Sequence, residues 1–465
     1  MVFSTLTFLF LFLPCVLLIN KLIKKAWRNY FLLLASLTFY AYGEPKFVFV
    51  MIASITMNYF FGLAIAKAKI NSIDIDALKT NKQRSYKKNN CRRAKLLLSA
   101  SIIFNIGLLA IFKYLNFAIS NIDHIFENLI PQTSIALPIG ISFFTFQAMS
   151  YVIDVYRGTV KVQENPFFMG FYISFFPQLI AGPIVRYKDI EERISDREIT
   201  FDDFAEGVRR FIIGISKKVL IANNMAIIAD KAFEISETGD LSVTFAWMGA
   251  LAFSMQIYFD FSGYSDMAIG LGRMFGFKYL ENFNYPYISK SVTEFWRRWH
   301  ISLSSWFRDY VYVPMGGSRV KKMMLFRNLF IVWMLTGIWH GASWSFVIWG
   351  FVYFVLLAFE KFTGYPNKFK RRISKSLYQI FTLTCVVINW VIFYDAGLNN
   401  TTEYIFSMFG LNGNAFFDMN TWMYLCEYFV IWLIAVLYST SFFEYIKNEM
   451  IKKSGMGENI VSTTA

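Results

Sequence analysis

The fold is decided by a stretch in two parts, EFWRRWHISLSSWFRDYVYVPMGGSR at residues 294–319 and NLFIVWMLTGIWHGASWSFVIWG at residues 328–350. The two parts contain His300 and His340, two of the three histidines in the chain. From Asn328 to Phe359 no Asp, Glu, Lys or Arg accompanies His340. An ionisable side chain at membrane depth costs about 2.5–3.5 kcal/mol or more and is by default a functional-site hypothesis. A neutral imidazole that helix-to-helix hydrogen bonds satisfy is the alternative interpretation of His340.

The first part of this stretch has a different pattern. Trp296, His300, Leu303 and Phe307 are spaced as one apolar face of a helix. The arginines lie off that face, and the segment is too charged to cross lipid. We therefore expect a continuous helix through His300 that is re-entrant or interfacial and packs against protein.

Composition independently indicates a membrane protein. The chain is 56% hydrophobic and only 17% charged, with a mean hydropathy of +0.41. Apolar windows long enough to cross a bilayer recur along it and predict an all-α polytopic protein of about eleven spans plus re-entrant or interfacial helices. A net charge of +14 is also found in proteins that bind nucleic acid. The basic residues instead gather between and beside the apolar windows, as in membrane proteins, which argues against nucleic acid.

The distribution of basic residues also predicts an orientation. Residues 1–20 carry no charged side chain and are followed by four basic residues, so we expect a first span with its N-terminus outside. Residues 67–95 hold ten Lys or Arg against two Asp and are expected to form a cytoplasmic loop. We expect this loop to determine orientation and to lie near anionic membrane lipid; contact with a negatively charged acyl donor or a carrier protein is the alternative. Residues 395–443 contain no Lys or Arg, which predicts an outer loop and a last span that returns the tail to the cytoplasm.

Several motifs together resemble the membrane-bound O-acyltransferase (MBOAT) family. Two stretches resemble the family signature: FWRRWHISLSSWFRDYVYVPMGGSR and GIWHGASW. Four more resemble the family's bacterial alginate and peptidoglycan O-acetylating branch and occur in the same order as there: MVFSTLTFLFLFLP, LPIGISFFTFQAMSYVIDVYRG, LIAGPIVRYKDI and YFDFSGYSDMAIGLGRMFGF. The resemblance covers about residues 1–395. The branch that transfers D-alanine to teichoic acid is less similar, because it usually has Asn at the position of Arg297 and lacks the PMGGSR turn.

The resemblance implies a fold and an activity. It implies one membrane domain over residues 1–465, built around a central catalytic tunnel, with residues 396–465 as outer loop, last span and tail. It implies His340 as the catalytic histidine and His300 as a second functional one. The expected donor is acetyl-CoA, reaching the site from the cytoplasm. The expected acceptor is an exported polysaccharide or peptidoglycan, modified outside the bacterial inner membrane with the help of a periplasmic or membrane-anchored transferase.

Neighbouring polar and aromatic residues are candidates to position substrate or line the tunnel. Asp260 and Asp266 stand in a polar segment between apolar sequences and either cap a helix or line an aqueous cavity. The positioning candidates are Trp296, Arg297, Arg298, Trp299, Asp309, Trp339, Asp260 and Tyr264.

The sequence offers no sign of a metal site or a bound cofactor. The four cysteines are scattered, and neither a metal-ligand spacing nor a P-loop, GxSxG elbow or dinucleotide fingerprint is present. A transporter or channel for an acyl donor or glycan, with the histidines as a proton relay, is one alternative function. A non-catalytic scaffold is another, and it would not need His340.

Overall fold

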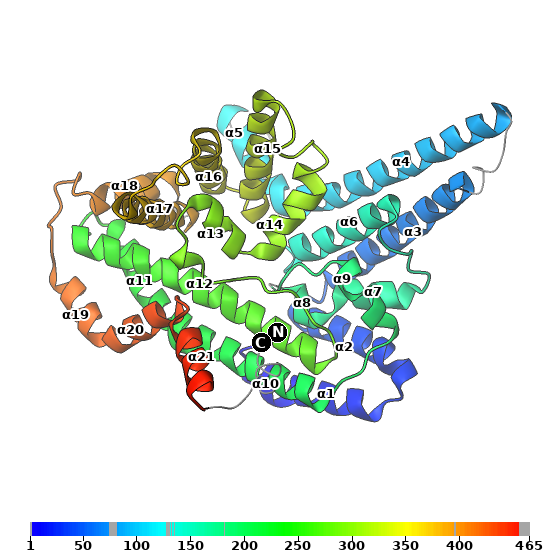
Figure 1. Cartoon of the computed structure of the whole chain (residues 1–465), viewed down its shortest axis with the longest axis horizontal. Coiled ribbons are helices and arrows are strands. Elements are labelled where there is room, and N and C mark those ends of the chain that lie inside the picture. The colour runs from blue at the N-terminus through cyan, green and yellow to red at the C-terminus, as the bar shows by residue number, and fades with distance from the viewer. Residues whose placement is uncertain are drawn as a thin grey trace. The chain divides into compact units, whose positions relative to one another are not determined.

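The structure is a computed structural model and describes residues 2–73, 81–126, 131, 133, 135–180, 182–394 and 397–454. Within these ranges every regular element is a helix, which confirms the all-α prediction (Figure 1). The chain forms two compact units, Met1–Phe204 with Leu271–Leu280, and Ala205–Gly270 with Glu281–Ala465. Both His300 and His340 belong to the second unit.

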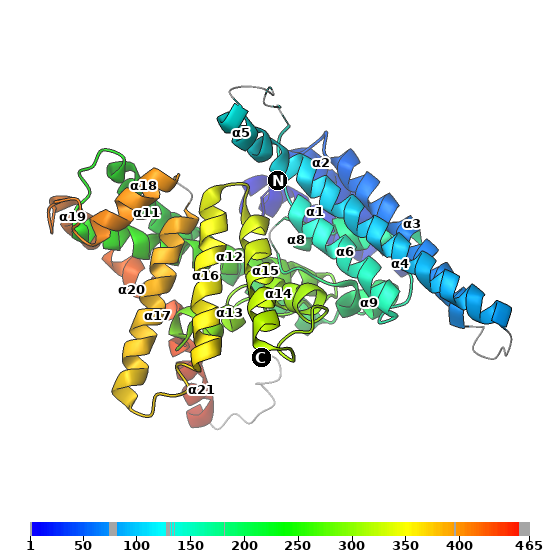
Figure 2. The ribbon, with the colours of Figure 1, turned by 90° about the horizontal axis from the view of Figure 1, so that it is seen from above.

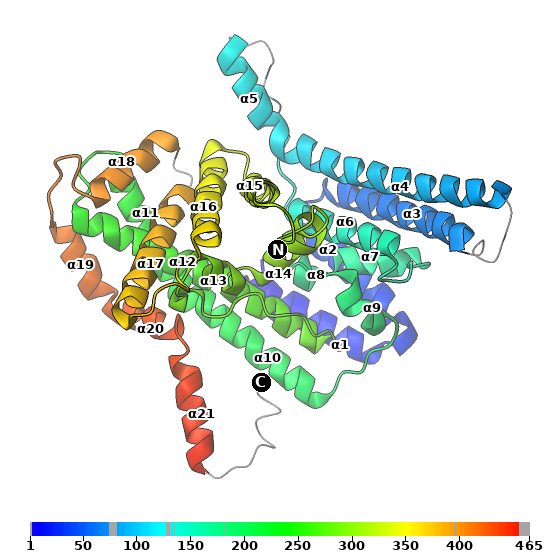
Figure 3. The same cartoon turned by 45° about the horizontal axis from the view of Figure 1, so that its top comes forward.

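The first unit is centred on long helices that pack side by side. α3 packs along α4 (Figure 3), α6 contacts both, and α2 packs on α7. Inside the α3–α4 interface the amides of Asn58 and Asn105 exchange hydrogen bonds of 3.1 and 2.8 Å. Such reciprocal polar pairs hold helices together in an apolar setting. The helices are α1 (Leu13–Leu22), α2 (Arg28–Gly43), α3 (Val48–Ile73), α4 (Asn81–Leu109), α5 (Leu115–Phe126), α6 (Ile141–Arg157), α7 (Pro166–Ser174), α8 (Phe176–Leu179) and α9 (Tyr187–Ser195).

The basic segment at residues 67–95 is largely helical, so the prediction of a loop is wrong. α3 continues to Ile73 and α4 begins at Asn81. Lys and Arg are good helix formers, and a charged continuation of an apolar helix stays helical once it leaves the lipid. Residues 74–80 and the side chains of residues 70–88 lie outside the described part.

The second unit begins with α10 and contains both candidate histidines. Its helices are α10 (Phe201–Ser216), α11 (Asn223–Ser236), α12 (Val243–Met274), α13 (Val292–Arg298), α14 (Ile301–Phe307), α15 (Lys322–His340), α16 (Trp344–Thr363), α17 (Arg372–Phe393), α18 (Leu398–Met408), α19 (Met419–Glu427), α20 (Phe429–Tyr438) and α21 (Phe442–Ser454). Short π-helical turns, η4 (Lys217–Ala222) and η6 (Arg308–Tyr312), extend α10 and α14.

Glycines let α10 and α12 approach closely as an antiparallel pair. A Cβ on Gly214 would lie 2.5 Å from the carbonyl oxygen of Gly263, and a Cβ on Gly270 would lie 2.6 Å from that of Gly207. The two contacts are seven residues apart on each helix, which is the spacing of one helix face over two turns. Backbone therefore packs directly on backbone along this seam.

This close packing brings the two acids of α12 into ion pairs with cations of α10 and η4. The Asp266 carboxylate bonds to Arg210 and Lys217, at 2.7 Å to each, and Asp260 pairs with Lys218. Because both acids lie inside the continuous helix α12, the prediction that they cap a helix is wrong. They neutralise cations of α10 and η4 instead.

α15 and α16 form a tight hairpin whose turn follows His340 directly. α15 ends at His340 and α16 begins at Trp344, and Figure 2 shows α15, α16 and α17 side by side. A Cβ on Gly337 would lie 2.4 Å from the carbonyl oxygen of Phe346 and 3.2 Å from Cα of Gly350. Only glycine fits this crossing, so the GIWHGASW motif encodes close packing directly beside the histidine.

Six helices of the described chain are long and apolar enough to cross a bilayer, and a bent pair, α19 and α20, would make a seventh. The predicted count of about eleven is not confirmed. The N-terminal apolar helix, Phe8–Leu22, is shorter than a full span. The six are Val48–Lys69, Asn89–Asp123, Phe201–Ser236, Lys322–His340, Trp344–Thr363 and Arg372–Phe393.

Candidate active site

The helix predicted to run through His300 is broken there. α13 ends at Arg298, Trp299 is extended, and His300 has a φ of 43°, in the left-handed region that non-glycine residues rarely adopt. His300 therefore does not share a helical face with Trp296, and the continuous-helix prediction is wrong. A conformation of this kind persists only where the surroundings impose it, and such positions cluster at functional sites.

Two sets of contacts impose the break. Before the break, Ser291 caps α13 by accepting from the Glu294 N–H. The buried Glu360 carboxylate of α16 also accepts from the backbone N–H groups of Val292 and Thr293, at 2.7 and 2.8 Å. After it, the Ile301 N–H donates to the carbonyl of Asn282 at 2.9 Å. The neighbouring Asn284 N–H donates to the Arg298 carbonyl at 2.9 Å, so the chain is held on both sides of His300.

The Asn282 side chain fixes the tautomer of His300. Asn282 Oδ1 accepts from the Ser302 backbone N–H at 3.2 Å, which identifies it as the oxygen, and Asn282 Nδ2 donates to Ser265 at 3.0 Å. His300 Nδ1 lies 3.1 Å from the same oxygen and 3.4 Å from the Ser302 hydroxyl. Because that hydroxyl donates to Asn282 Oδ1 at 2.9 Å, the contacts favour a hydrogen on Nδ1. Nε2 of His300 is then a bare acceptor.

His300 is held in a dry environment. Its side chain is 1% exposed, and the part of the chain that the structure describes gives Nε2 no hydrogen-bond partner. Burial lowers the pKa of His300 to about 3, because the charged imidazolium would lose its hydration. His300 is thus neutral at physiological pH, with a lone pair on Nε2 available to a hydroxyl hydrogen.

His340 lies in an aromatic enclosure at the end of a helix. Its ring meets Trp339, Trp349 and Phe393 nearly edge to face, with centroids 4.9, 4.9 and 5.1 Å away. The side chain is only half-buried, in contrast to His300. As the last residue of α15, His340 lies at the end of its apolar helix, in the turn before α16.

Trp339 connects the two histidines. Its ring centroid is 6.0 Å from that of His300 and 4.9 Å from that of His340. The fold thus brings together the two histidines and one predicted positioning residue, although 40 residues separate His300 from His340 in the sequence. The three rings form the candidate active site.

The other aromatic candidates belong to the packed core beside this site. Trp296 contacts Trp333, Trp349 and Tyr353, and Trp299 stacks on Phe295 and lies 4.7 Å from the Trp390 ring. Trp349 also contacts His340, so this cluster forms one wall of its enclosure.

The charged candidates are dispersed. Arg298 pairs with Glu294 at 2.9 Å and donates to the Asn284 carbonyl, so it holds the end of α13 in place. Asp309 pairs with Arg308 at 2.8 Å. Asp260 pairs with Lys218, and the half-buried Tyr264 follows it one turn along α12. Arg297 is exposed and lines a pocket on the opposite side of α13 from the aromatic core.

Sequence reasoning missed two residues that position the site. Asn282 gives no motif signal, because its role depends on contacts with residues about twenty positions later. Glu360 is the first acid after the apolar run that contains His340. A lone carboxylate at the end of an apolar helix is itself a candidate for a functional or structural role, so the sequence could have indicated it. Within the described residues no group of three or more His, Cys, Asp or Glu has a metal-binding arrangement.

Comparison with known proteins gives the family. A family model described as MBOAT, membrane-bound O-acyltransferase family, matches residues 156–365. The chain is 43% identical over 399 residues to the "Probable alginate O-acetylase AlgI" of Pseudomonas aeruginosa, covering 84% of this chain and 72% of that protein. It is 36% identical over 450 residues to the "Peptidoglycan O-acetyltransferase" of Helicobacter pylori, covering 89% and 80%.

A third relative, the "Teichoic acid D-alanyltransferase" of Bacillus subtilis, is 33% identical over 244 residues, which cover 50% of this chain and 60% of that protein. The first two matches span most of this multi-pass membrane protein and include both histidine motifs. The chain therefore belongs to the membrane-bound O-acyltransferase family and is an O-acyltransferase.

Proposed function

We propose that this chain is a membrane O-acetyltransferase. It takes an acetyl group from a cytoplasmic thioester, acetyl-CoA, and passes it across the bacterial inner membrane for O-acetylation of an extracytoplasmic polysaccharide. The observation that carries the proposal is that His300 and His340 both lie beside the ring of Trp339. The extent of the matches to O-acetylating relatives supports acetyl as the transferred group.

The chemistry needs a base and a confined site. A hydroxyl oxygen of the acceptor attacks the thioester carbonyl while His340 takes the hydroxyl proton; the carbon–sulfur bond breaks, and the proton passes from His340 to the leaving thiolate. General-base catalysis of this kind contributes about 10²–10⁴-fold. The imidazolium forms at the carbonyl end of α15, where the helix dipole favours positive charge.

His300 orients the acceptor by accepting from a second hydroxyl of that molecule, because the attacking hydroxyl gives its one hydrogen to His340. With Nδ1–H committed to Asn282, Nε2 offers a lone pair and no hydrogen. This tautomer supports orientation of a hydroxyl or relay of its proton, and it argues against donation to an oxyanion. Holding donor and acceptor together contributes up to about 7–11 kcal/mol in favourable intramolecular reactions.

The final acceptor is an alginate-like exopolysaccharide or peptidoglycan, reached through a separate periplasmic or membrane-anchored transferase. The names of the two relatives that match most of the chain support this acceptor class. The D-alanylating relative matches only half of the chain, so D-alanyl transfer is the weaker proposal.

The test is transfer of radiolabelled acetyl from acetyl-CoA by the purified protein in nanodiscs, with the polysaccharide and the candidate partner supplied. Wild type, His340→Ala and His300→Ala are compared at equal folded amounts. Activity that depends on His340 supports the mechanism. Equal activity in His340→Ala would refute it, and inactivity of every folded sample would favour a transporter.

The proposed orientation places the N-terminus outside and the C-terminus in the cytoplasm. Two exposed native cysteines report on it: Cys91 in the basic segment and Cys426 near the end of α19. In intact spheroplasts, a membrane-impermeant maleimide should label a variant that retains only Cys426 and spare one that retains only Cys91. The reverse pattern would invert the orientation.

A further inference from the structure

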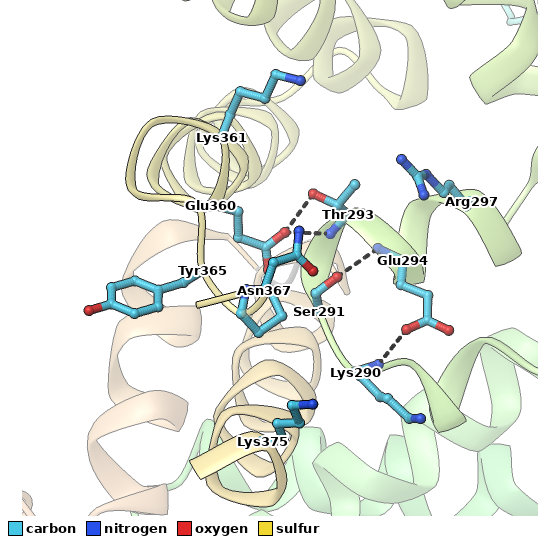
Figure 4. Close-up of a pocket in the computed structure, with 12 residues that line it drawn as sticks. Lys290, Ser291, Thr293, Glu294, Arg297, Glu360, Lys361, Tyr365, Asn367 and Lys375 are labelled. Atoms are coloured by element: carbon cyan, nitrogen blue, oxygen red, sulfur yellow. Dashed lines mark hydrogen bonds between the residues drawn. The ribbon is translucent and has the colours of Figure 1, made fainter. Parts of the chain in front are cut away.

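Two supports hold the backbone at His300. On one side, the Glu360 carboxylate of α16 accepts from N–H groups at the start of α13 (Figure 4). On the other side lies the loop of residues 281–287. The Asn284 N–H of this loop donates to the Arg298 carbonyl at 2.9 Å, and the Arg298 guanidinium donates back to the Asn284 carbonyl at 3.0 Å. Whatever fixes the 281–287 loop therefore also fixes His300.

The 281–287 loop is itself strained. Among the described residues other than glycine, only Tyr285 and His300 have left-handed backbone, with φ of 45° and 43°. Such conformations persist only where the surroundings impose them. The loop therefore needs anchors outside itself, and α12 provides them. At the far end of the loop, the Tyr287 hydroxyl donates to the Ser254 carbonyl of α12.

At the near end, two successive residues of the loop attach to two successive residues of α12. Asn282 Nδ2 donates to the Ser265 hydroxyl at 3.0 Å. Glu281 reaches the next residue, Asp266, through Arg210, whose Nη2 lies 2.6 Å from the Glu281 carboxylate and 2.7 Å from that of Asp266. The attachment thus has a neutral half at Ser265 and an ionic half at Arg210.

The charges of the ionic half balance. The Asp266 side chain is 7% exposed and pairs with both Arg210 and Lys217, so two cations meet one buried carboxylate. Glu281 supplies the second negative charge. An exposed ion pair is usually weak, because both side chains must be ordered to form it. Here Asp266 already orders Arg210, so only Glu281 loses freedom when it binds.

We propose that Ser265 and Arg210 are positioning residues for His300. Ser265 orients the Asn282 amide so that its oxygen faces Nδ1 of His300, 3.1 Å away. Arg210, through Glu281, fixes the backbone that carries this amide. The inference rests on the proposed function and deepens it, because the tautomer with the hydrogen on Nδ1 keeps a lone pair on Nε2 for the acceptor.

The tautomer of His300 tests this proposal without an activity assay. The chain has three histidines, so protein labelled with ¹⁵N at histidine in a His124→Ala background has two imidazoles to assign by NMR in nanodiscs. Wild-type His300 should show one neutral tautomer, with the hydrogen on Nδ1. In Ser265→Ala the Asn282 amide can flip and present its NH₂ group to Nδ1, which places the hydrogen on Nε2. A second set of His300 signals should therefore appear.

Glu281→Ala tests the ionic half. It detaches the loop from Arg210 and leaves the buried pair of Arg210 with Asp266 in place, so the fold is kept. Arg210→Gln would instead remove a partner of a buried carboxylate, which is costly to stability. In Glu281→Ala the loosened backbone no longer holds the Asn282 amide in one orientation, and the second tautomer of His300 should again appear.

Each variant has a matched control. Ser262 lies on the same helix and is as buried as Ser265, but its hydroxyl has no hydrogen bond within the described part of the chain. Glu234 forms an exposed ion pair with Lys231 on α11, apart from the loop. Ser262→Ala and Glu234→Ala should keep one tautomer. A single tautomer in Ser265→Ala or in Glu281→Ala would overturn that half of the attachment, and a second tautomer in a control would overturn both.

Kinetics separate positioning from a general loss of stability. Ser265→Ala and Glu281→Ala should each lower kcat about threefold to tenfold and change KM for acetyl-CoA less than twofold, because the donor is not disturbed. In an Asn282→Ala background neither change should lower kcat further, since both act through that amide. Additive losses would show a structural role and overturn the proposal. Wild type that has the expected tautomer and transfers no acetyl would refute the proposed function alone.

Discussion

The two histidines of the site are held in opposite ways. His300 is fully buried and fixed by a polar network centred on Asn282. His340 is half-buried and enclosed by rings, at the end of an apolar helix. A hydrogen-bonded imidazole in a dry site keeps one tautomer, whereas a half-buried imidazole at the carbonyl end of a helix is more readily protonated. The contrast assigns orientation to His300 and proton transfer to His340.

The largest expected effect is at His340, and added imidazole should separate the two positions. His340→Ala should lower kcat about 10²–10⁴-fold, as expected for loss of a general base. Because His340 is half-buried, imidazole from solution should enter the vacated enclosure and restore part of the activity in acetyl transfer. His300→Ala leaves a closed site and should not respond.

His124→Ala is the control for this experiment, since the sequence predicts a surface position for the third histidine and its side chain lies outside the described part. Rescue of His300→Ala but not of His340→Ala would reverse the assigned roles.

The second largest effect is expected at Asn282, and its variants test whether Asn282 sets the tautomer of His300. Asn282→Ala removes the acceptor of Nδ1–H and should lower kcat about tenfold or more, with little change in KM, through misorientation of a catalytic group. Asn282→Asp keeps the acceptor oxygen and adds a carboxylate, which raises the pKa of His300 from its value of about 3 in wild type.

The protonated form of His300 has no lone pair on Nε2. Asn282→Asp should therefore be active at pH 8 and lose activity as pH falls and His300 becomes protonated. Wild type should show no such loss at these pH values, because its His300 stays neutral. A pH–rate profile of Asn282→Asp that superimposes on that of wild type would remove Asn282 from the positioning role.

The sequence was informative where structure is local and failed where it is tertiary. The apolar run around His340 predicts helix at membrane depth, and α15 and α16 are long and apolar enough to cross a bilayer. Periodicity predicted a helix through His300, because it could not detect that Asn282 holds the chain in a left-handed turn. For Asp266 the sequence left a helix cap and a cavity lining open, because its partner Arg210 lies on another helix, 56 residues earlier.

The span count shows the same limit. Hydropathy finds long apolar helices reliably, and six satisfy the length and composition of a span. Much of the remaining apolar sequence forms short helices such as α7 and α8, which are buried among other helices. Hydropathy does not distinguish a segment buried by protein from one buried by lipid.

The smallest expected effect concerns the hairpin that supports His340. Gly337→Ala puts a Cβ 2.4 Å from the Phe346 carbonyl oxygen, so α15 and α16 must move apart, at a cost typical of overpacking, about 1–3 kcal/mol. Gly107→Ala is the matched control, because Gly107 is also helical and a Cβ there meets nothing within 4 Å. Thermal unfolding in detergent should show a lower Tm for Gly337→Ala and an unchanged or slightly higher Tm for Gly107→Ala.

The two histidines should respond differently to this loosening. Separation of α15 from α16 shifts Trp349 relative to His340, whereas the Asn282–His300 contacts belong to other segments. Folded Gly337→Ala should therefore lose activity below its Tm, and it should show none of the loss at low pH that is expected of Asn282→Asp. If the two glycine variants had equal Tm and equal activity, the contact of α15 with α16 would not be what holds His340 in place. The contrast between a half-buried His340 in a ring enclosure and a fully buried His300 would then not explain their roles.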